Sequence, residues 1–339
     1  MAVLSVEKEL LMARATLASL EVRPLADEDL PVVVALENDG LPPERRRSVA
    51  QRRGHFTSQP TQDQDVLRLV AGTTGGPAVA YLEVIDYPKF PRTKVRCRLS
   101  PVVDSAHRRR GIGSALYERA LAFAQERQAA ILQVGFLQPA TEGPGTAFLR
   151  RHGFRELEDE RRLTSHLDLR TYDAARFSDL AERVEREGIH IVPCEALPDT
   201  TDNRRRLYDL FVAAGMIWDR STFETWGMAP ERWHWAQQAL VIAQAADGAW
   251  VGFTQVAPYC RETGVWRTAH AATLPAFRNR GIGTALKLRS IALLRGRGCR
   301  VMLTANRLNN APILAINRKL GYVPGPLELT YLQRLREAG

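Results

Sequence analysis

The chain has 339 residues, of which 45% are hydrophobic and 25% are charged, and its formal net charge at pH 7 is +9. This composition is typical of a soluble globular protein, and at about 150 residues per domain the length predicts two domains. No apolar run approaches the roughly 20 residues that a membrane span needs, and the opening "MAVLSVEKELLMARATLASLEVR" is an amphipathic helix pattern with acids, unlike a secretory signal. We therefore expect a cytoplasmic protein with no membrane partner.

The four cysteines stand far apart and have no CxxC spacing. This pattern predicts neither a zinc site nor a disulfide framework, and we expect no metal. The arginines are dispersed in short clusters such as Arg45–Arg47 and Arg204–Arg206, which favours solvated faces over a nucleic-acid stripe. The charge still permits a phosphorylated cofactor or an RNA such as tRNA.

Hydrophobic periodicity and turn residues predict the elements of the first half. In chain order they are a strand from Leu20, a helix begun near 27–29, a hairpin over 65–72 and 77–87, a strand over 94–103, the turn "RRRGIG" at Arg108–Gly113, a helix over 114–127, a strand over 130–136 and a short helix from 145 that ends at Gly153.

The second half repeats this order. Its predicted elements are a strand over 188–197, a helix over 203–215, a hairpin over 239–258, a strand over 265–275, the turn "RNRGIG" at Arg278–Gly283, a helix over 284–298, a strand over 300–305 and a helix over 311–322. The two turns stand about 170 residues apart, and so do the helix ends "HGF" and "LGY". Five elements in the same order indicate a duplication. We predict domains at 1–170 and 189–339, joined by a linking helix at 171–188.

Each glycine turn opens a helix directly after a strand. The first N–H groups of a helix have no partner within it, so they attract anions, and glycine lets the main chain come close to the ligand. The chain has no Walker loop, no complete dinucleotide fingerprint, and no HExxH or GxSxG motif. The turns therefore predict a phosphate or pyrophosphate site in both halves, although a purely structural tight turn is the competing interpretation.

RxxGxG between a strand and an amphipathic helix, with "LGY" or "HGF" about 40 residues later, resembles the GCN5-related N-acetyltransferase (GNAT) superfamily. The duplication resembles its tandem members, and the likeness is most specific in "TLPAFRNRGIGTALKLR" and "TANRLNNAPILAINRKLGY". It implies an α/β fold of two tandem GNAT-like domains, each a mixed, mostly antiparallel twisted sheet flanked by helices, with a splayed central strand pair. It also implies acetyl-CoA as the cofactor, its pyrophosphate on the turn and its pantetheine between the splayed strands.

Carried over residue by residue, the resemblance implies two sets of cofactor-binding residues. In the second half they are Ala272, Thr273, Leu274, Arg278, Asn279, Arg280, Gly281, Ile282, Gly283 and Thr284. In the first half they are Val102, Val103, Arg108, Arg109, Arg110, Gly111, Ile112, Gly113 and Ser114. Asn306 and Asn310 follow the strand over 300–305, and their amides suit pantetheine. The competing interpretation is that Asn306 caps the next helix or stabilises the turn.

The catalytic groups are less clearly marked. Many GNAT proteins place a tyrosine, as the acid for the departing thiolate, where this chain has Asn317 and, in the first half, Leu149. Asparagine donates a hydrogen bond but is no acid, and leucine does neither. His270, on the strand before the second turn, is a candidate base, directly or through water, and a structural histidine is the alternative. For the acceptor pocket we expect Trp218, Asp219 and Glu224, within a tryptophan-rich stretch suited to a cationic amine; core packing competes for these rings.

The first half departs further from the pattern. Pro101 removes an N–H from the strand expected to meet the cofactor, and no asparagine pair follows the next strand. We therefore expect an acetyl-CoA-dependent N-acetyltransferase of a small-molecule primary amine, working by direct attack in the second half. The alternatives are a catalytically degenerate CoA-binding protein and an acyltransferase that takes its acyl group from aminoacyl-tRNA. The sequence leaves monomer and homodimer open.

Overall fold

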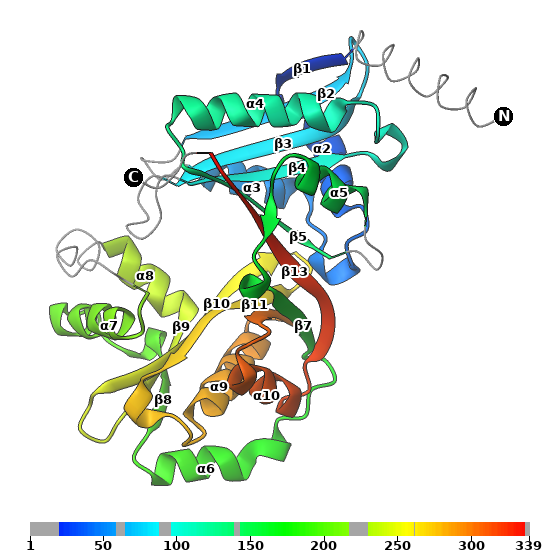
Figure 1. Ribbon diagram of the computed structural model, residues 1–339. Coiled ribbons are helices and arrows are strands. Elements are labelled where there is room, and N and C mark those ends of the chain that lie inside the picture. Colours follow the sequence, from blue (N-terminus) through cyan, green and yellow to red (C-terminus); the bar gives the residue numbers. More distant parts are fainter. Residues whose placement is uncertain are drawn as a thin grey trace. The chain divides into compact units, whose positions relative to one another are not determined.

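The protein is described by a computed structural model that covers residues 20–58, 65–87, 96–138, 143–216, 230–260 and 262–335 (Figure 1). The chain forms two compact units: the first comprises Met1–Arg161 with Leu327–Gly339, and the second comprises Arg162–Pro326. These boundaries lie at other residues than the sequence-predicted 1–170 and 189–339. Among the described residues, no helix combines the length and the apolar character needed to cross a bilayer.

The first unit is a sheet between two layers of helices; six described strands follow one another in it, and the short β6 (Arg155–Glu156) pairs with the last of them. Its strands, in spatial order, are β1 (Leu20–Pro24), β2 (Val66–Thr73), β3 (Ala78–Tyr87), β4 (Arg96–Val103), β5 (Ile131–Leu137) and β13 (Val323–Arg334). Apolar residues of α4 (Ile112–Glu126) and α5 (Pro144–Arg151) cover one face, where Leu116 and Ala120 are fully buried at helical spacing. The helices α2 (Leu30–Asn38) and α3 (Val49–Ser58) cover the other face (Figure 1).

The second unit repeats this architecture. Its strands, in spatial order, are β7 (Arg162–Asp168), β12 (Val301–Arg307), β11 (Val265–Thr273), β10 (Trp250–Cys260), β9 (Leu240–Gln244) and β8 (His190–Pro193). One face packs against α6 (Ser178–Arg186), α9 (Ile282–Gly296) and α10 (Ala311–Lys319). The other face packs against α7 (Thr201–Ala213) and α8 (Pro230–Ala239). The Thr200 side chain caps α7 by accepting a hydrogen bond from the Asn203 N–H at 3.1 Å.

Each sheet has one parallel strand pair, and that pair separates. In the second unit β11 and β12 pair only from Val265↔Val301 to Arg267↔Leu303. In the first unit β4 and β5 pair only from Arg96↔Ile131 to Leu99↔Val134. The remaining strand pairs within both units are antiparallel. The predicted mixed sheet with a splayed central strand pair is therefore confirmed in both halves.

The last strand of each sheet comes from the other half of the sequence. β7 follows the elements of the first unit along the chain, yet it pairs antiparallel with β12 from Val301↔Asp168 to Arg307↔Arg162. β13 follows α10 of the second unit, yet it pairs antiparallel with β5 from Glu328↔Leu137 to Arg334↔Ile131. The sequence analysis did not predict these two strands, nor α3 and α8.

The predicted linking helix at 171–188 contains α6, which belongs to the second unit. Its buried Leu180 and Val184 pack with Ile282 and Ala285 of α9. The apolar side of this helix is thus part of the core of the second unit.

Candidate functional site

The two glycine turns have the same backbone conformation. Arg109 and Asn279 both have a φ of 64°, and Gly111 and Gly281 both have a φ of 83°. Glycine is the residue that adopts such a left-handed conformation without steric cost, which explains why both copies keep it at the start of the helix. In each turn an arginine folds back onto the preceding strand: Arg108 Nε donates to the Val103 carbonyl at 3.0 Å, and Arg278 Nε donates to the Thr273 carbonyl at 3.1 Å.

Backbone N–H groups gather at the second turn. Among the described residues, no backbone carbonyl accepts a hydrogen bond from the N–H groups of Arg280 and Gly281. Ile282 and Gly283 open α9, so their N–H groups precede its first backbone bonds, which the Thr284 and Ala285 N–H groups donate to the Gly281 carbonyl, each at 3.0 Å. Four consecutive donors at a helix N-terminus form a site suited to an anion.

The helix α6 lies directly against this turn. A β-carbon placed on Gly281 would come within 2.8 Å of the Leu180 side chain, and the Val184 side chain lies 3.4 Å from the same point. Glu187, just after α6, lies near Arg280, with 3.7 Å between its Oε2 and the arginine Nε. The second glycine of the motif is different: a β-carbon on Gly283 would face the flexible end of Ile316 at 3.3 Å.

The end of β11 runs past its last pairing with β12 toward this turn. Ala272 and Leu274 pack against the cluster beneath α7 and α8. Thr273 faces the opposite side, where its Oγ1 lies 3.8 Å from the position of a β-carbon on Gly283. The predicted residues Ala272–Leu274 and Arg278–Thr284 therefore run from the end of β11 through the turn into the first turn of α9, where Ile282 and Thr284 are buried.

The three predicted asparagines occupy neighbouring positions on β12 and α10. Asn317 is buried; its Nδ2 donates to Asn306 Oδ1 at 2.8 Å, and its own Oδ1 is buried without a partner among the described residues. Asn306 Oδ1 also accepts a hydrogen bond from the Thr304 hydroxyl at 3.1 Å. The helix cap comes from Asn310, whose Oδ1 accepts from the Ile313 N–H at 3.4 Å. A buried acceptor without a donor is a place where a ligand N–H or S–H group fits.

His270 lies on β11, opposite Gln255 of β10. It stands two residues before Ala272, and strand alternation places it on the face that α7 and α8 share. Its side chain is exposed, and desolvation together with the positive charges of Arg267 and Arg162 lowers the pKa of its imidazole below 6.5. A lowered pKa keeps the ring neutral at pH 7, the form that accepts a proton.

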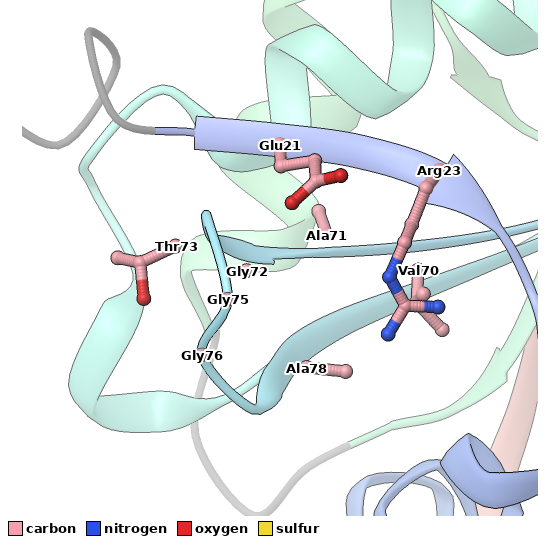
Figure 2. Close-up of a pocket in the computed structure, with 9 residues that line it drawn as sticks. All are labelled: Glu21, Arg23, Val70, Ala71, Gly72, Thr73, Gly75, Gly76 and Ala78. Carbon is pink, nitrogen blue, oxygen red and sulfur yellow. The ribbon is translucent and has the colours of Figure 1, made fainter.

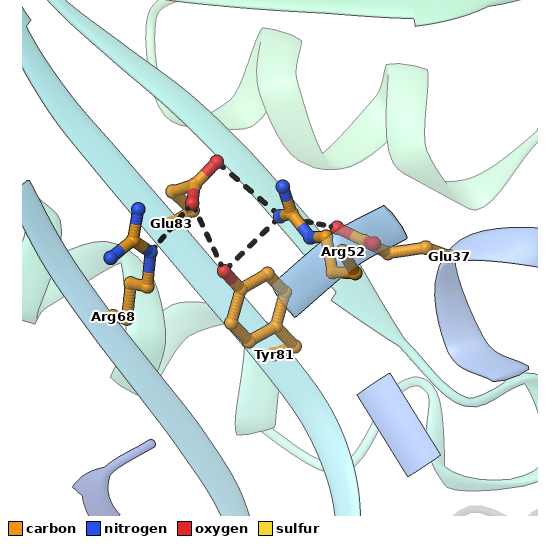
Figure 3. A network of polar contacts seen from close by, with 5 residues as sticks. All are labelled: Glu37, Arg52, Arg68, Tyr81 and Glu83. Carbon is orange, nitrogen blue, oxygen red and sulfur yellow. Dashed lines mark hydrogen bonds and ion pairs between the residues drawn. The ribbon is translucent and has the colours of Figure 1, made fainter. Parts of the chain in front are cut away.

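The corresponding face of the first unit is occupied by a charged network (Figure 3). Glu83 of β3 stands opposite Ser100 in the register, as Gln255 stands opposite His270 in the second unit. Arg68 Nε donates to Glu83 at 2.8 Å, and Arg52, which is 2% exposed, contacts Glu37 at 2.7 Å and Glu83 at 3.3 Å. Desolvation raises the pKa of the Glu83 carboxyl, but the charges of Arg52 and Arg68 outweigh it, so the pKa is lowered.

Other predicted residues of the first unit are arranged without comparable chemistry. Val102 and Val103 end β4 beyond its pairing with β5, and Pro101 lies in the same separated segment. Leu149, at the position of Asn317, is buried in the apolar cluster beneath α4.

Trp218, Asp219 and Glu224, which were predicted to line the acceptor pocket in the second half, lie outside the described residues.

A hollow of about 210 Å³ lies at the β2–β3 hairpin, away from the predicted residues (Figure 2). Figure 2 shows Glu21 and Arg23 reaching from β1 toward this hairpin. Arg23 is already bound by Asp29 through contacts of 2.6 and 2.8 Å. We assign no function to this hollow.

Sequence reasoning missed the packing of α6 on the second turn and the network around Arg52. In α6, the spacing of Leu180 and Val184 indicates an apolar helix face. The spacing does not indicate which element that face packs against. In "VAQRRGHF" two adjacent arginines look alike, yet Arg52 is buried and Arg53 is 52% exposed at its side chain.

Comparisons with known proteins agree with this geometry. A model described as an acetyltransferase (GNAT) domain matches residues 70–156, and a model described as the acetyltransferase (GNAT) family matches residues 204–322. No curated protein matches the chain in sequence.

Several solved structures share the fold. A tandem GNAT protein from the clavulanic acid biosynthesis pathway has a TM-score of 0.72 at 19% identity, covering 94% of this chain and 100% of its own. A GNAT protein from Sphaerobacter thermophilus has a TM-score of 0.68 at 18% identity, covering 95% and 97%. A glucosamine N-acetyltransferase region of a fungal β-N-acetylglucosaminidase has a TM-score of 0.72 at 17% identity, covering 92% of this chain and 38% of the other. With one family match in each unit and the same duplicated architecture, the chain belongs to the GCN5-related N-acetyltransferase superfamily as a tandem member.

Proposed function

We propose that the protein is an acetyl-CoA-dependent N-acetyltransferase that acts on a small-molecule primary amine and that its second unit carries the reaction. The observation that carries this proposal is the row of four open N–H groups from Arg280 to Gly283 at the mouth of the splayed strands. The helix dipole and these donors favour the pyrophosphate of CoA, and Arg278 adds positive charge at the rim.

The residues around the splay fit the rest of the cofactor. Asn317 Oδ1 is a buried acceptor without a partner among the described residues, and a pantetheine amide or a thiol supplies the missing donor. β11 beyond Arg267 no longer pairs with β12, so its free edge can bind an extended amide chain.

Acetyl-CoA supplies an activated thioester to the amine. The role of His270 is to take the proton of the attacking amine on a ring nitrogen, directly or through water, since its lowered pKa favours the neutral ring. Asn317 fixes the cofactor chain and donates no proton, so the departing thiolate takes its proton from water or from another group.

The charged network argues against acetyl transfer in the first unit. Glu83 is held as a carboxylate by Arg52 and Arg68, so it is a weak base and lies within a closed set of ion pairs. Leu149 supplies no polar group where the second unit has Asn317. We propose that the first turn can bind CoA but that the first unit does not catalyse acetyl transfer.

Matched substitutions in the two turns test the proposal. Gly283→Asp places a carboxylate in the first turn of α9, where it suits the helix dipole but competes with pyrophosphate. Its β-carbon meets the flexible end of Ile316 at 3.3 Å and the Thr273 hydroxyl at 3.8 Å, whereas a side chain at Gly281 would collide with α6. Gly113→Asp makes the same change in the first unit, where the neighbour is Phe148 at 3.4 Å.

We expect Gly283→Asp to weaken acetyl-CoA binding about tenfold or more in calorimetric titration, and to abolish thiol release with an amine panel. Gly113→Asp should retain turnover. Equal turnover in wild type and a folded Gly283→Asp variant would refute the assignment to the second unit. CoA binding without thiol release for any amine would favour the degenerate binding protein, and salt-sensitive tRNA retention would favour an aminoacyl-tRNA donor.

A further inference from the structure

A seam between α9 and α10 leads from the second glycine turn into the core of the second unit. Gly283 and Lys287 stand four residues apart on α9, so they share one face of the helix. A β-carbon on Gly283 would lie 3.3 Å from the Ile316 side chain of α10. One helical turn further on, Lys287 Nζ lies 4.9 Å from the centre of the ring of Tyr322, which follows α10. Lys287 therefore lies in this seam, beneath the turn proposed to bind the pyrophosphate.

The Tyr322 ring connects this seam to the point where the strands separate. Its hydroxyl donates a hydrogen bond to Met302 Sδ of β12 at 4.0 Å. Burial raises the pKa of the same hydroxyl, and the Thr268 hydroxyl of β11 partly offsets that rise, so Thr268 lies close to it. Thr268 is the first residue of β11 beyond the last pair with β12, Arg267↔Leu303. The ring in contact with the ammonium thus ends between the two splayed strands.

Two buried polar groups beside this ring lack a partner among the described residues. Lys287 is 1% exposed and its Nζ has no acceptor, and Asn317 is 3% exposed and its Oδ1 has no donor. The Asn317 carbonyl accepts a hydrogen bond from the Tyr322 N–H at 3.0 Å, which places Asn317 next to the same tyrosine. Burial of an ammonium group without an acceptor is unfavourable. A ligand atom that gains negative charge in this place would stabilise Lys287.

The first unit has a different group at the same helix position. Tyr117 stands four residues after Gly113, as Lys287 stands four residues after Gly283, and its hydroxyl donates to Gln333 Oε1 at 2.9 Å. The tyrosine is therefore satisfied within the first unit. Lysine, unlike arginine, can lose its proton in a protein. The unit proposed to carry the reaction thus has a cation with a transferable proton at this position.

We propose that Lys287 is the proton donor for the CoA thiolate that departs in acetyl transfer. This inference rests on the proposed function, which places the pantetheine chain beside Asn317 and between the splayed strands. Asn317 is no acid and His270 takes the proton of the amine, so the thiolate needs another donor. Burial lowers the pKa of Lys287 to about 8, so the side chain is still protonated at pH 7 and gives up its proton more readily than an exposed lysine.

The two side chains handle one proton each. His270 takes a proton from the amine as its nitrogen forms a bond to the carbonyl carbon of the thioester. Lys287 Nζ gives a proton to the sulfur as the C–S bond breaks and its electron pair stays on sulfur. CoA then leaves as a thiol, and Lys287 is left as a neutral amine. After the products leave, both side chains return to their starting forms by exchanging protons with water.

A titration of bound CoA tests the position of Lys287 without any amine. The thiolate absorbs in the ultraviolet where the thiol does not, and the spectrum of the protein alone is subtracted. A cation about 4–6 Å from the sulfur should lower the pKa of the CoA thiol by about 1–3 units in wild type relative to Lys287→Met. Lys319→Met, at an exposed position on α10, is the matched control and should keep the wild-type value. Equal thiol pKa values in wild type and Lys287→Met would overturn the inference.

The surroundings of Lys287 do not interfere with this titration. Burial alone lowers its pKa, so no charged side chain among the described residues of α6, α10 or the sheet acts on it. The titratable groups nearby are Tyr322 and, next to it, Tyr172 and Cys299. Burial raises the pKa of each of them, to about 12 for Tyr172 and Cys299, so all three stay neutral between about pH 6 and 9.

Thiol release with the amine panel gives the kinetic test. Lys287→Met should lower kcat at least about tenfold at pH 7. The ratio of wild-type to variant kcat should then fall as the pH rises above about 8, because Lys287 loses its proton there. Thermal unfolding of the variant shows that it is folded. Equal kcat in wild type and the folded variant, with a ratio that does not vary with pH, would leave water as the donor and overturn the inference.

The two measurements separate this inference from the proposed function. Turnover that Lys287→Met leaves unchanged would refute the role of Lys287 and keep the acetyltransferase. A lowered thiol pKa that depends on Lys287, without turnover of any amine, would refute the acetyltransferase and support the position of Lys287 beside the sulfur. A wild-type protein that does not bind CoA would refute both.

Discussion

Lys287 Nζ lies 4.9 Å from the centre of the Tyr322 ring, and no described residue accepts a hydrogen bond from it. The side chain is 1% exposed, on α9 beneath the candidate site. Burial of an ammonium group away from water is unfavourable, and this desolvation lowers the pKa of Lys287 from 10.5 to about 8. The second unit therefore holds a buried cation at pH 7 that contacts the face of the Tyr322 ring.

Because Lys287 is buried, the free energy of unfolding of the second unit changes with pH in the alkaline range. Between about pH 8 and 10.5, the unfolded chain binds a proton at Lys287 that the folded chain does not. The free energy of unfolding therefore rises with pH across that window, by about 3 kcal/mol in total, and this contribution is level below pH 8.

Lys287→Met should remove that dependence. Below about pH 8 we expect the variant to be more stable than wild type by up to about 3 kcal/mol, and the difference should shrink as the pH approaches 10.5. Urea unfolding at several pH values measures it. Lys319→Met is the control, because Lys319 is exposed on α10. A Lys287→Met variant that is less stable than wild type at pH 7 would contradict the argument.

Asn317 predicts a conflict between stability and function. Its Oδ1 is buried without a partner among the described residues, and leaving such a group unsatisfied costs about 1–3 kcal/mol. Asn317→Leu copies Leu149 of the first unit, while Asn306 keeps its bond from the Thr304 hydroxyl. We expect equal or greater thermal stability and at least about a tenfold higher KM for acetyl-CoA. Unchanged kinetics would exclude a cofactor contact.

His270 predicts a particular pH profile for acyl transfer. The pKa of the His270 imidazole lies below 6.5, so the ring loses its proton as the pH rises through that pKa. We therefore expect kcat/KM to rise with pH in the same range and to level off once the ring is neutral. His270→Gln should lower kcat about 10²-fold or more and remove this limb. The ratio of wild type to variant, measured between about pH 5 and 8, cancels the titration of the amine itself. A ratio that does not vary with pH would assign His270 a structural role.

The sequence predicted those features that depend on local conformation. Gly111 and Gly281 occupy left-handed positions that favour glycine, so the duplicated turn was visible as a motif. Pairing between distant strands leaves no such mark. "RLTSHLD" of β7 alternates like any strand, and its choice of β12 as partner is set by packing with residues more than a hundred positions away. Lys287 was hidden for a similar reason, because a lysine in a helical pattern suggests an exposed position.

Arg52 predicts a large stability effect without loss of activity. Arg52→Met leaves the buried Glu83 and the half-buried Glu37 with one cation fewer, and breaking a buried ion pair costs about 3–5 kcal/mol. Arg53→Met is the matched control, because its ion pair with Asp27 is exposed at both ends and should contribute at most about 1 kcal/mol. We expect a lower unfolding midpoint only for Arg52→Met, with unchanged kcat at temperatures where the protein is folded. A comparable loss of kcat would place part of the reaction in the first unit.

Because β13 pairs with β5 and β7 pairs with β12, a substitution in one of these strands should destabilise a strand that is distant in the sequence. Tyr331 of β13 is 1% exposed, stacks on Phe136 of β5 with ring centres 5.6 Å apart, and donates a hydrogen bond from its hydroxyl to Glu156 at 3.2 Å. Tyr331→Ala leaves a cavity that costs about 3–5 kcal/mol. In hydrogen exchange, protection should therefore fall in β5, about 200 residues earlier in the chain.

Leu167→Ala in β7 makes the reciprocal test. Leu167 pairs with Met302 of β12 and is buried in the same apolar cluster. Its loss should expose the amides of β12 to exchange while those of β5 stay protected, because β7 pairs with β12 in the second unit and β5 pairs with β13 in the first. If instead Tyr331→Ala deprotects β12 and Leu167→Ala deprotects β5, each half closes its sheet with its own last strand, and the exchange of strands is wrong.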